Sequence, residues 1–453
     1  MKSITFKEAA AAVKSTTELN GSFNCVCTDT RKIEQGCLFI AIKGENFDGH
    51  EFAAKAIELG AQAVICEKDC GLGVNQIVVE STRQALLDLA GYYRSLFNIP
   101  VIGITGSVGK TTTKEMVHAV MSVKYNTLKN EGNLNNEIGV PLTLFRLDES
   151  HEAAVIEMGM SGFEEIARMT AAVRPDVAII SNIGVSHIEK LGSREGILKA
   201  KLEILQGMKN GAPVILNGDD DMLSTVSLAD HPITRYGIEN KDFAFVAENI
   251  NVGETQVAFD AVCSDGRIGV ELPFPGKHNV YNALAATAAG SFFGISAQDA
   301  LEALKKYVPA GMRQKIVKKC GITFIEDCYN ASPDSQAAAL AVLGGMNAKR
   351  KIAVIGDMLE LGSYSAQAHA LVGEKAVENK IDVLFTYGER SVETAKAAQG
   401  GVNLVKSFSD KQQLSAELTS MLEQGDAILF KASRGMKLED VIFSIYSSLE
   451  GVD

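Results

Sequence analysis

Short apolar runs rich in β-branched residues recur through the middle of the chain and predict buried strands. The runs VIGITG (101–106), AAVIEMG (153–159), VAIISNIG (177–184) and PVILNGD (213–219) each lead into a glycine or a polar loop. Stretches that favour helices separate them, and this alternation is typical of a mainly parallel sheet with crossover helices. We therefore expect an α/β domain in the middle of the chain.

Similar patterns occur at both ends. Near the start, LFIAI (38–42) and AQAVICE (61–67) predict strands, and residues 51–59 between them predict a helix. Towards the end, the strand-like runs ITFIED, KIAVIGDM, VLFTYGE and AILFKAS alternate with Ala-rich helical stretches such as DSQAAALAVL. Residues 243–274 interrupt the pattern, because alternating runs around a turn at 264–266 predict an antiparallel hairpin.

The length of the chain indicates how these patterns divide. At 453 residues it exceeds the size at which one core keeps growing, so about three domains are expected. The segment 98–100 is a hinge candidate, and the alternating pattern resumes after Pro309. The predicted fold class is therefore α/β with three domains: a small N-terminal α/β domain (1–98), a central domain with a mainly parallel sheet (99–310) and a C-terminal Rossmann-like α/β domain (311–453).

Composition and charge narrow the class of protein. Hydrophobic residues make up 46% of the chain and charged residues 22%, as in ordinary globular proteins. The net charge of −12 argues against nucleic-acid or anionic-membrane partners, because phosphate contacts need clustered Lys and Arg. Neither a membrane-spanning stretch nor a signal peptide is indicated, so we expect a cytoplasmic protein. The eight cysteines show no pairing of C-x-x-C motifs, which favours reduced thiols over a zinc site or a disulfide framework.

One glycine-rich segment predicts a phosphate-binding loop between a strand and a helix. Its glycines let backbone N–H groups face phosphate oxygens, Lys110 reaches the terminal phosphates, and Thr111 can ligate Mg²⁺. The general pattern needs Gly at 104, where this chain has Ile, which points away from the commonest P-loop proteins. The central domain is thus predicted to be a P-loop mononucleotide-binding domain, with a glycine-rich surface turn as the alternative. The loop reads Thr105, Gly106, Ser107, Val108, Gly109, Lys110, Thr111, Thr112, Thr113.

Two further polar residues follow predicted strands. Glu157 ends the strand in VIEMG, and His187 follows the strand in SNIGVSHIE. Ligands gather beyond the carboxyl ends of parallel strands, so both side chains are candidates to converge on the phosphate loop. A carboxylate suits Mg²⁺, whereas a His indicates a second, more tolerant metal position. Taken alone, Glu157 would more often be a satisfied carboxylate at a strand end and His187 a loop residue.

The ordered set of motifs resembles the Mur ligases of bacterial cell-wall synthesis, with folylpolyglutamate synthetase as a more distant relative. Besides the loop, Glu157 and His187, the shared motifs are Lys201 in KAKLEI, PGKHNVYNALAA (275–286), Arg313 and KASRGMKLE (431–439), and they span nearly the whole chain. Segments 130–147, 327–340 and 355–369 resemble in particular the members that add D-alanyl-D-alanine. The chain departs from the family at Ala432, where Gly is usual.

The resemblance implies an ATP-dependent ligase that joins D-alanyl-D-alanine to the terminal carboxylate of UDP-N-acetylmuramoyl-tripeptide through an acyl phosphate. It implies Lys110, Glu157, His187 and Lys201 as catalytic residues. It also implies two Mg²⁺ ions, with Thr111, Glu157, His187 and a carbamoylated Lys201 as metal ligands. Without the family, Lys201 would be interpreted as a solvated helix lysine.

Further binding residues come from the same resemblance. Taken alone, Asp29 and Arg31 would be interpreted as a surface ion pair, and the asparagines as helix-cap or turn residues. For ATP the resemblance implies the loop residues Thr105 to Thr112, Asn279 and Asn282 for adenine, Asp327 for ribose, and Arg313 for the phosphates. For the UDP-substrate it implies Asp29, Thr30, Arg31 and the segment 43–52, and for the peptides Asn133, Asn135, Asn136, Lys431 and Arg434.

Other functions remain open at this point. A sister ligase would add a diamino acid or glutamate instead of the dipeptide, and a nucleotide-gated switch would hydrolyse ATP without ligation. A dinucleotide oxidoreductase is disfavoured, because no G-x-G-x-x-G follows the candidate strands. We expect small-molecule substrates only, a monomer, and closure of the third domain on the other two when substrates bind.

Overall fold

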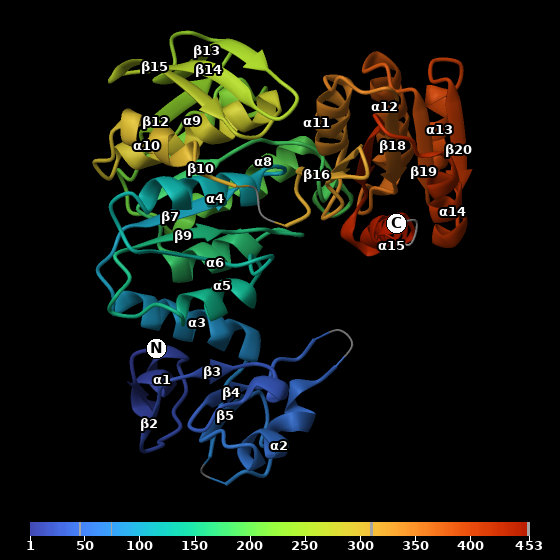
Figure 1. The fold of residues 1–453 in the computed structure, drawn as a ribbon. Helices are drawn as coiled ribbons and strands as arrows, with labels where there is room; N and C mark the ends of the chain where they lie inside the picture. The colour runs from blue at the N-terminus through green and yellow to red at the C-terminus, as the bar shows by residue number, and fades with distance from the viewer. Residues whose placement is uncertain (45–46, 74, 309–310, 451–453) are drawn as a thin grey trace.

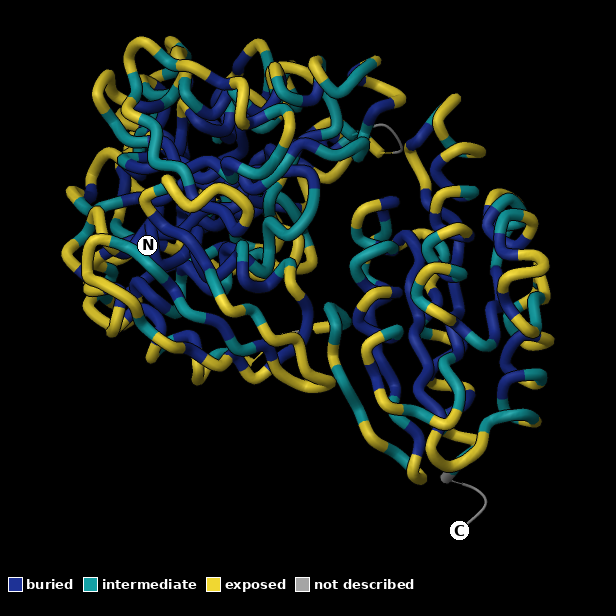
Figure 2. The backbone as a smooth tube through the Cα atoms, turned by 90° about the horizontal axis from the view of Figure 1, so that it is seen from above, coloured by how far each residue is buried: buried dark blue, intermediate teal, exposed yellow. Residues whose placement is uncertain are grey.

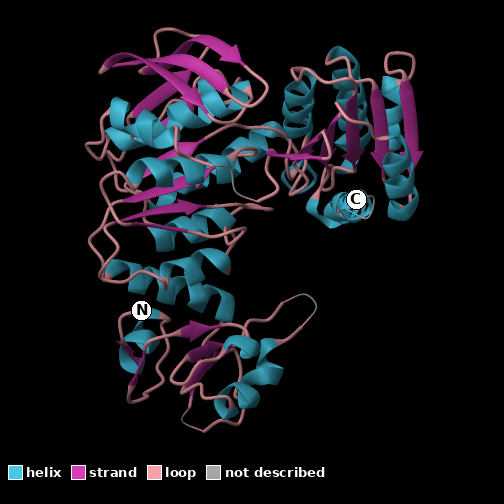
Figure 3. Cartoon of the chain, in the orientation of Figure 1, coloured by secondary structure: helices cyan, strands magenta, loops and turns pink. Residues whose placement is uncertain are grey.

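The computed structural model describes residues 1–44, 47–73, 75–308 and 311–450. Within them the strands form sheets of two, four, nine and six strands, which lie in three parts of the molecule (Figure 1). Helices flank the sheets (Figure 3), and the strands run through the buried interior (Figure 2). The predicted α/β fold class is confirmed.

The N-terminal part contains two small sheets. The four-stranded sheet is parallel throughout, and the two-stranded sheet is antiparallel. The helix predicted at 51–59 is present as a 3-10 turn, η2 (Gly49–Phe52), followed by α2 (Ala53–Glu58). The remaining elements are β1 (Ile4–Thr5), α1 (Phe6–Ala12), β2 (Ser22–Phe23), β3 (Val26–Cys27), η1 (Thr30–Lys32), β4 (Leu38–Ile40), β5 (Ala63–Cys66), β6 (Gln76–Val78) and α3 (Thr82–Ser95).

The central part is built on the nine-stranded sheet, whose order is β15-β14-β13-β12-β11-β10-β7-β9-β8. Seven strands are parallel, and β14 and β15 add an antiparallel hairpin with the predicted turn. The sheet strands are β7 (Val101–Thr105), β8 (Thr127–Lys129), β9 (Ala153–Glu157), β10 (Val177–Ile180), β11 (Val214–Asn217), β12 (Ile233–Gly237), β13 (Phe245–Val252), β14 (Val257–Cys263) and β15 (Gly266–Leu272). Every residue of β7, β9 and β10 is buried, which explains why these strands are apolar runs without alternation.

Helices cover both faces of the central sheet. The small side chains of α9 are buried nearly all round the helix, because it packs against α4, α10 and the sheet. The helices are α4 (Lys110–Met121), α5 (Gly139–Leu144), α6 (Glu165–Val173), α7 (Ile188–Leu191), α8 (Arg194–Leu202), α9 (Lys277–Ser291) and α10 (Ala297–Leu304), with 3-10 turns η3 (Glu203–Gly207) and η4 (Leu223–Thr225).

The C-terminal part has a six-stranded sheet of order β16-β17-β21-β18-β19-β20, parallel except for β16. Ser332 caps α11, and Pro333 occupies its first turn, where a missing N–H costs nothing. The elements are β16 (Lys315–Lys319), β17 (Ile322–Glu326), α11 (Pro333–Gly344), β18 (Lys351–Gly356), η5 (Gly362–Tyr364), α12 (Ser365–Glu378), β19 (Val383–Tyr387), α13 (Val392–Ala398), β20 (Leu404–Phe408), α14 (Lys411–Met421), β21 (Ala427–Lys431), η6 (Arg434–Met436) and α15 (Glu439–Glu450).

Contacts between the parts are relevant to the predicted domains, but they do not define the residue at which each domain ends. Helix α3 precedes the predicted boundary at 98/99 but packs against α5 and α6 of the central part. The Tyr93 hydroxyl donates to the carbonyl of Leu147, 2.6 Å away, and Tyr93 is fully buried. The second boundary, at 310/311, touches residues 309–310, which lie outside the described residues. The three residue ranges therefore remain a prediction.

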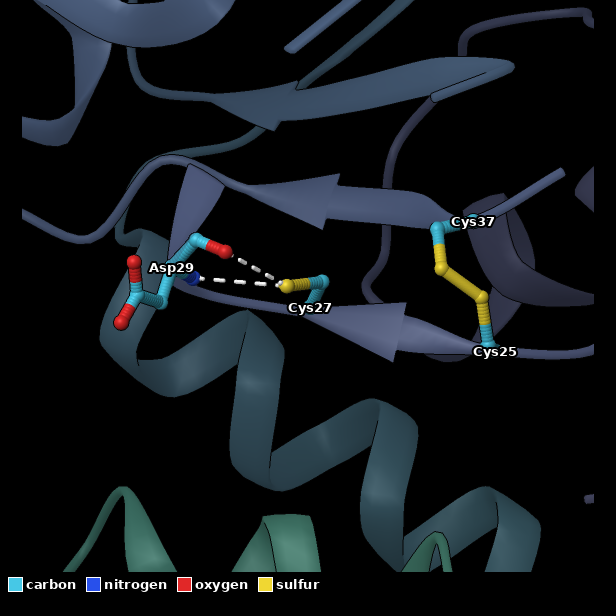
Figure 4. The surroundings of a disulfide bond; sticks show 4 residues. All are labelled: Cys25, Cys27, Asp29 and Cys37. Atoms are coloured by element: carbon cyan, nitrogen blue, oxygen red, sulfur yellow. Dashed lines mark hydrogen bonds between the residues drawn. A yellow bond between two sulfur atoms is a disulfide. The ribbon is translucent and has the colours of Figure 1, made fainter. Parts of the chain in front are cut away.

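The expectation that the cysteines are reduced thiols is wrong for one pair. Cys25 and Cys37 form a disulfide, with their Cα atoms 4.7 Å apart (Figure 4). Residues 26–27 pair in parallel with residues 38–39, which brings the two cysteines side by side at the start of the neighbouring strands. A spacing rule that looks for C-x-x-C motifs misses such a pair, because strand pairing creates the proximity.

Candidate active site

The phosphate loop connects β7 to α4, as predicted. Gly109 precedes the helix with φ +79°, in the left-handed region that favours glycine, and a Cβ there would lie 3.2 Å from Asn282 Oδ1. At Gly106 a Cβ would lie 2.0 Å from Ser181 Oγ. The loop's two glycines are therefore required by close approach of neighbouring side chains as well as by backbone conformation.

Residues that follow β10 hold the loop in place. Val108 N donates to Asn182 Oδ1 and Asn182 Nδ2 donates back to Val108 O, both at 2.8 Å, while Ser107 N donates to Asn182 O at 3.0 Å. Ser181 Oγ donates to Val108 O at 3.0 Å. Asn182 and Ser181 were not among the predicted site residues. Their position directly after a strand that neighbours β7 is the signal that could have identified them.

Several loop groups suit a phosphate ligand. Thr105 Oγ1 and Ser107 Oγ are buried hydroxyls without a hydrogen-bond partner among the described residues. Lys110 Nζ lies over the loop and donates to the carbonyls of Gly106 (2.8 Å) and Ser107 (3.3 Å). Burial lowers the pKa of Lys110, and the negative charge of Glu157 opposes that shift. Unsatisfied donors beside a lysine at a helix N-terminus fit the phosphates of a nucleotide.

Glu157 lies beside the loop and is held from two sides. Thr111 Oγ1 donates to Glu157 Oε2 at 2.9 Å, and Asn135 Nδ2 donates to Glu157 Oε1 at 2.7 Å. A carboxylate and a hydroxyl are hard oxygen ligands, which is the donor type that Mg²⁺ prefers. The pair Thr111 and Glu157 thus fits a magnesium ion next to the phosphates.

His187, a further predicted metal ligand, contacts the C-terminal part of the molecule. Among the described residues no group of three or more His, Cys, Asp or Glu side chains is arranged to hold a metal ion. His187 precedes α7 with φ +64°, and its Nδ1 lies 2.5 Å from Glu360 Oε2 of the C-terminal part. The imidazole of His187 holds the pKa of Glu360 below its usual value. His187 therefore sits at the contact between the central and C-terminal parts.

Lys201 lies in α8 and is buried, with 2% of its surface exposed. In the part of the chain that the structure describes, its ammonium forms no hydrogen bond or ion pair. Burial, together with the positive charge of Lys110, holds the pKa of Lys201 well below its ordinary value. The shift favours the neutral amine over the ammonium, and the neutral amine is the form that reacts with CO₂.

The two asparagines predicted for adenine lie inside α9. Thr113 Oγ1 donates to Asn282 Oδ1 at 3.1 Å, which places Asn282 against the phosphate-loop helix. Asn279 Nδ2 donates to Pro275 O at 2.7 Å and to Gln314 Oε1 at 3.3 Å. Asn282 is thus the one next to the loop, whereas Asn279 reaches the segment that enters the C-terminal part.

The C-terminal residues form a second group. Lys431 Nζ donates to Asp327 Oδ2 at 2.7 Å in a buried ion pair. The guanidinium carbons of Arg313 and Arg434 lie 4.0 and 5.8 Å from the ring centre of Tyr329, which sequence reasoning did not select. Four of these five residues lie at or just after the carboxyl ends of the neighbouring strands β17 and β21, and Arg313 precedes β16, so only the fold makes them neighbours.

Ala432 follows Lys431 directly, and its methyl group occupies a defined space next to β18. A Cβ at Gly356 would lie 2.6 Å from that methyl, so the glycine in β18 makes room for it. The departure from the family pattern is accommodated within the core.

The residues predicted for the UDP-substrate and the peptide lie apart from these groups. Asp29 and Arg31 form an exposed ion pair, with Arg31 Nη2 2.7 Å from Asp29 Oδ2, and Thr30 lies between them in η1. Residues 45–46 of the segment 43–52 lie outside the described residues. Asn136 Oδ1 accepts from Gly139 N at 2.8 Å and so caps α5, and Asn133 is exposed beside Asn135. Among these, Asn135 alone contacts a predicted catalytic residue.

Comparison with known proteins assigns the chain to a family. Three family models match successive parts of the chain: "Mur ligase family, catalytic domain" at residues 22–94, "Mur ligase middle domain" at 104–290 and "Mur ligase, glutamate ligase domain" at 312–434. The UDP-N-acetylmuramoyl-tripeptide--D-alanyl-D-alanine ligase of Bacillus subtilis is 40% identical over 434 residues, 93% of each chain. The chain belongs to the Mur ligase family.

Solved structures of other Mur ligases support the same arrangement. A crystal structure of MurF from Acinetobacter baumannii matches this Mur ligase with a TM-score of 0.92 and 33% identity over 99% of both chains. MurF of Thermotoga maritima in complex with ADP matches with a TM-score of 0.87 and 28% identity, covering 95% of this chain and 98% of that one. The predicted three-domain Mur ligase architecture and the ligase class are thereby confirmed. Among the described residues, none of the helices combines the length and apolar character needed to cross a membrane.

Proposed function

We propose that this Mur ligase joins D-alanyl-D-alanine to the C-terminal carboxylate of UDP-N-acetylmuramoyl-tripeptide, with conversion of ATP to ADP and phosphate, in peptidoglycan precursor synthesis. The observation that carries the proposal is the 40% identity over 93% of the chain to a relative that bears this activity in its name. The phosphate loop, with its unsatisfied hydroxyls and Lys110, supports ATP as the energy source. The nucleotide-linked substrates support a cytoplasmic location, and we further propose that the protein is a monomer.

The chemistry explains why the site needs positive charge. A carboxylate is unreactive towards amines, so its oxygen first attacks the γ-phosphorus of ATP, forming an acyl phosphate while ADP leaves. The dipeptide amine then attacks the acyl carbon, and phosphate leaves as the amide forms. Because two anions meet in the first step, Lys110 lowers the barrier by neutralising the phosphates in line with the attack.

Magnesium and a modified lysine complete the proposal. Thr111 and Glu157 would hold one Mg²⁺, which supplies further charge neutralisation at the phosphates. His187 and Lys201 would hold a second ion, with Lys201 converted by CO₂ into a carbamate whose oxygen is an anionic ligand. The buried amine of Lys201 supports this modification, since it lacks a counter-ion and burial lowers its pKa.

The remaining residues divide among three ligands. The residues of the phosphate loop are proposed to bind ATP together with Asn282 and Asn279 at adenine. Arg313 and Asp327 of the C-terminal group are proposed to meet its phosphates and ribose. The bidentate geometry of a guanidinium suits Arg434 to the dipeptide carboxylate, with Lys431 beside it. Asp29, Thr30 and Arg31 are proposed to bind the UDP group, and Asn133, Asn135 and Asn136 the tripeptide.

A ligation assay tests the proposed function. Purified protein is incubated with ATP and each UDP-muramoyl precursor, including tripeptides that carry either diaminopimelate or lysine, together with each candidate amine. We expect ADP release and product only with a tripeptide and D-alanyl-D-alanine. ADP release with an earlier precursor and glutamate or a diamino acid would identify a sister ligase. Slow hydrolysis that no peptide alters would identify a nucleotide switch.

A further inference from the structure

Lys114 is a buried cation that the proposed reaction does not use. It lies one turn after Lys110 in α4, with 0% of its surface exposed. Its ammonium donates to the carbonyl oxygen of Asn130 at 2.7 Å and lies 3.1 Å from Glu115 Oε1 and 3.9 Å from Glu157 Oε2. Burying an ammonium costs free energy unless hydrogen bonds and ion pairs replace the lost hydration, so these contacts have a structural role.

Pairing with Glu115 does not by itself account for Lys114. Lys129 also forms an ion pair with Glu115, through the other carboxylate oxygen, and the Lys129 side chain is 28% exposed. Glu115 therefore has a partly solvated counter-ion without Lys114. What Lys114 contributes and Lys129 does not is the bond to Asn130 and a positive charge beside Glu157.

Asn130 is the centre of a buried network that attaches a loop to the end of β9. Asn130 Nδ2 donates to the carbonyls of Glu157 and Leu134, both at 2.9 Å, and Glu157 N donates to Asn130 Oδ1 at 2.9 Å. Further along the loop, Gly159 N donates to Asn135 O at 2.7 Å, and the Asn135 amide holds the Glu157 carboxylate. Lys114 thus connects the phosphate-loop helix to the start of the loop that carries Asn133, Asn135 and Asn136.

We propose that Lys114 is a positioning residue for the peptide substrate: it fixes loop 130–136 against α4, so that Asn135 and Glu157 face the acceptor carboxylate and the nucleotide together. This inference rests on the proposed function, because it takes the loop to meet the tripeptide. The nucleotide loop itself is held elsewhere, by Asn182 and Ser181, and receives no bond from Lys114. Loss of Lys114 should therefore separate peptide binding from nucleotide binding.

The test compares Lys114→Met with Lys129→Met, because both substitutions remove a cation that contacts Glu115 but only the first removes the bond to Asn130. For Lys114→Met we expect the KM for UDP-tripeptide to rise at least about tenfold, with a lower kcat. We expect the KM for ATP to stay within about twofold. Amide hydrogen exchange in residues 130–136 should become faster, a readout that needs no catalysis. Lys129→Met should leave all of these values near wild type.

Equal KM values and equal loop exchange in Lys114→Met and wild type would overturn the proposal. So would a parallel rise in both KM values, which indicates general loosening of the site. If Lys114→Met does not fold, Lys114→Arg serves as a second variant that keeps the buried positive charge. Because the Lys114 side chain has no exposed surface, the larger guanidinium must push the loop away from α4. The proposal then predicts faster loop exchange and a raised tripeptide KM in Lys114→Arg, and unchanged values would overturn it.

Calorimetric binding of UDP-tripeptide separates this inference from the proposed function. If the wild type ligates and Lys114→Met binds the tripeptide as tightly as the wild type does, the proposed function stands and the inference is overturned. If the wild type binds the tripeptide without ligating it, and Lys114→Met binds it at least about tenfold more weakly, the proposed function is overturned and the inference is upheld.

Discussion

At the residue scale, surroundings decide what a side chain can do. Lys199 and Lys201 are two residues apart on α8, yet Lys199 is exposed and Lys201 is buried without a counter-ion. Burial lowers the pKa of Lys201 and so favours its neutral form more than at an exposed lysine. The same residue type therefore has a solvated side chain at one position and a buried amine without a counter-ion at the other.

Substitution of Lys201 tests its modification. We expect Lys201→Ala to lose most ligation activity, because the second metal ion loses an anionic ligand, and bicarbonate or acetate to restore part of it. Lys199→Ala, on the exposed side of the same helix, is the matched control and should retain activity. The measurement is the initial rate of ADP release with both peptide substrates. A fully active Lys201→Ala variant would refute the role.

The Cys25–Cys37 disulfide also acts at the residue scale. It closes a short loop, with a sequence separation of 12, around Asp29, Thr30 and Arg31. A crosslink of this length restricts the unfolded chain and is expected to contribute about 3 kcal/mol to the free energy of unfolding. Cys37→Ser should lose about that amount relative to the oxidised protein, as measured by denaturant unfolding. Wild type in strong reductant should match the variant, and a variant as stable as oxidised wild type would contradict the estimate.

At the scale of elements, the phosphate loop depends on what surrounds the start of α4. Asn182 follows β10, and Asn282 lies in α9, far along the chain, yet both are adjacent to the loop. The parallel order of β10 and β7 brings the carboxyl end of one strand beside the other. The loop's shape is therefore a property of three elements, although its sequence motif belongs to one segment.

Gly109→Ala tests this dependence. We expect the left-handed backbone to cost about 1–2 kcal/mol of stability, and the new methyl group to displace the Asn282 amide and weaken ADP binding at least about tenfold. Gly211 has a similar φ of +82° with no atom within 4 Å of an added Cβ, so Gly211→Ala carries the backbone cost alone. Calorimetric titration with ADP distinguishes them, and equal ADP affinity in the two variants would contradict the prediction.

At the scale of the whole molecule, the residues that we propose for one reaction lie on separate parts. His187 meets Glu360 across the contact between the central and C-terminal parts, and a Cβ at Gly184 would lie 2.4 Å from Asp334 Oδ2. Burial at this contact raises the pKa of Asp334, which Arg194 opposes. Asp29 and Arg31 lie at η1 in the N-terminal part. That part is on the other side of α3 from the central sheet (Figure 1). The proposed binding of three ligands at one centre therefore predicts that the parts move.

Solution scattering tests this movement. We expect the radius of gyration to fall when a non-hydrolysable ATP analogue and UDP-tripeptide are both present, because the C-terminal part closes over the nucleotide. Each ligand alone serves as the control. Identical scattering profiles with and without the ligand pair would contradict closure.

Sequence patterns alone predicted the α/β fold class, the strands around the phosphate loop, the hairpin after residue 243 and the loop itself. These features depend on local periodicity and on glycine and lysine spacing, which are legible within a few residues. The roles of Glu157, His187 and Lys201 came from the family resemblance and remain predictions. Their order along the chain carries no information about distance in space.

The tertiary structure alone revealed four contacts: the hydrogen bonds of Asn182 to the phosphate loop, the buried Lys114–Asn130 network, the stacking of Arg313 on Tyr329 and the Cys25–Cys37 disulfide. Each contact joins segments that strand order and helix packing bring together. A lysine, an asparagine or a cysteine has the same sequence signature whether it is solvated or buried. The phosphate loop was therefore determined by the sequence itself, whereas the groups that hold it, and the lowered pKa values of Lys110 and Lys201, were decided by burial in the folded chain.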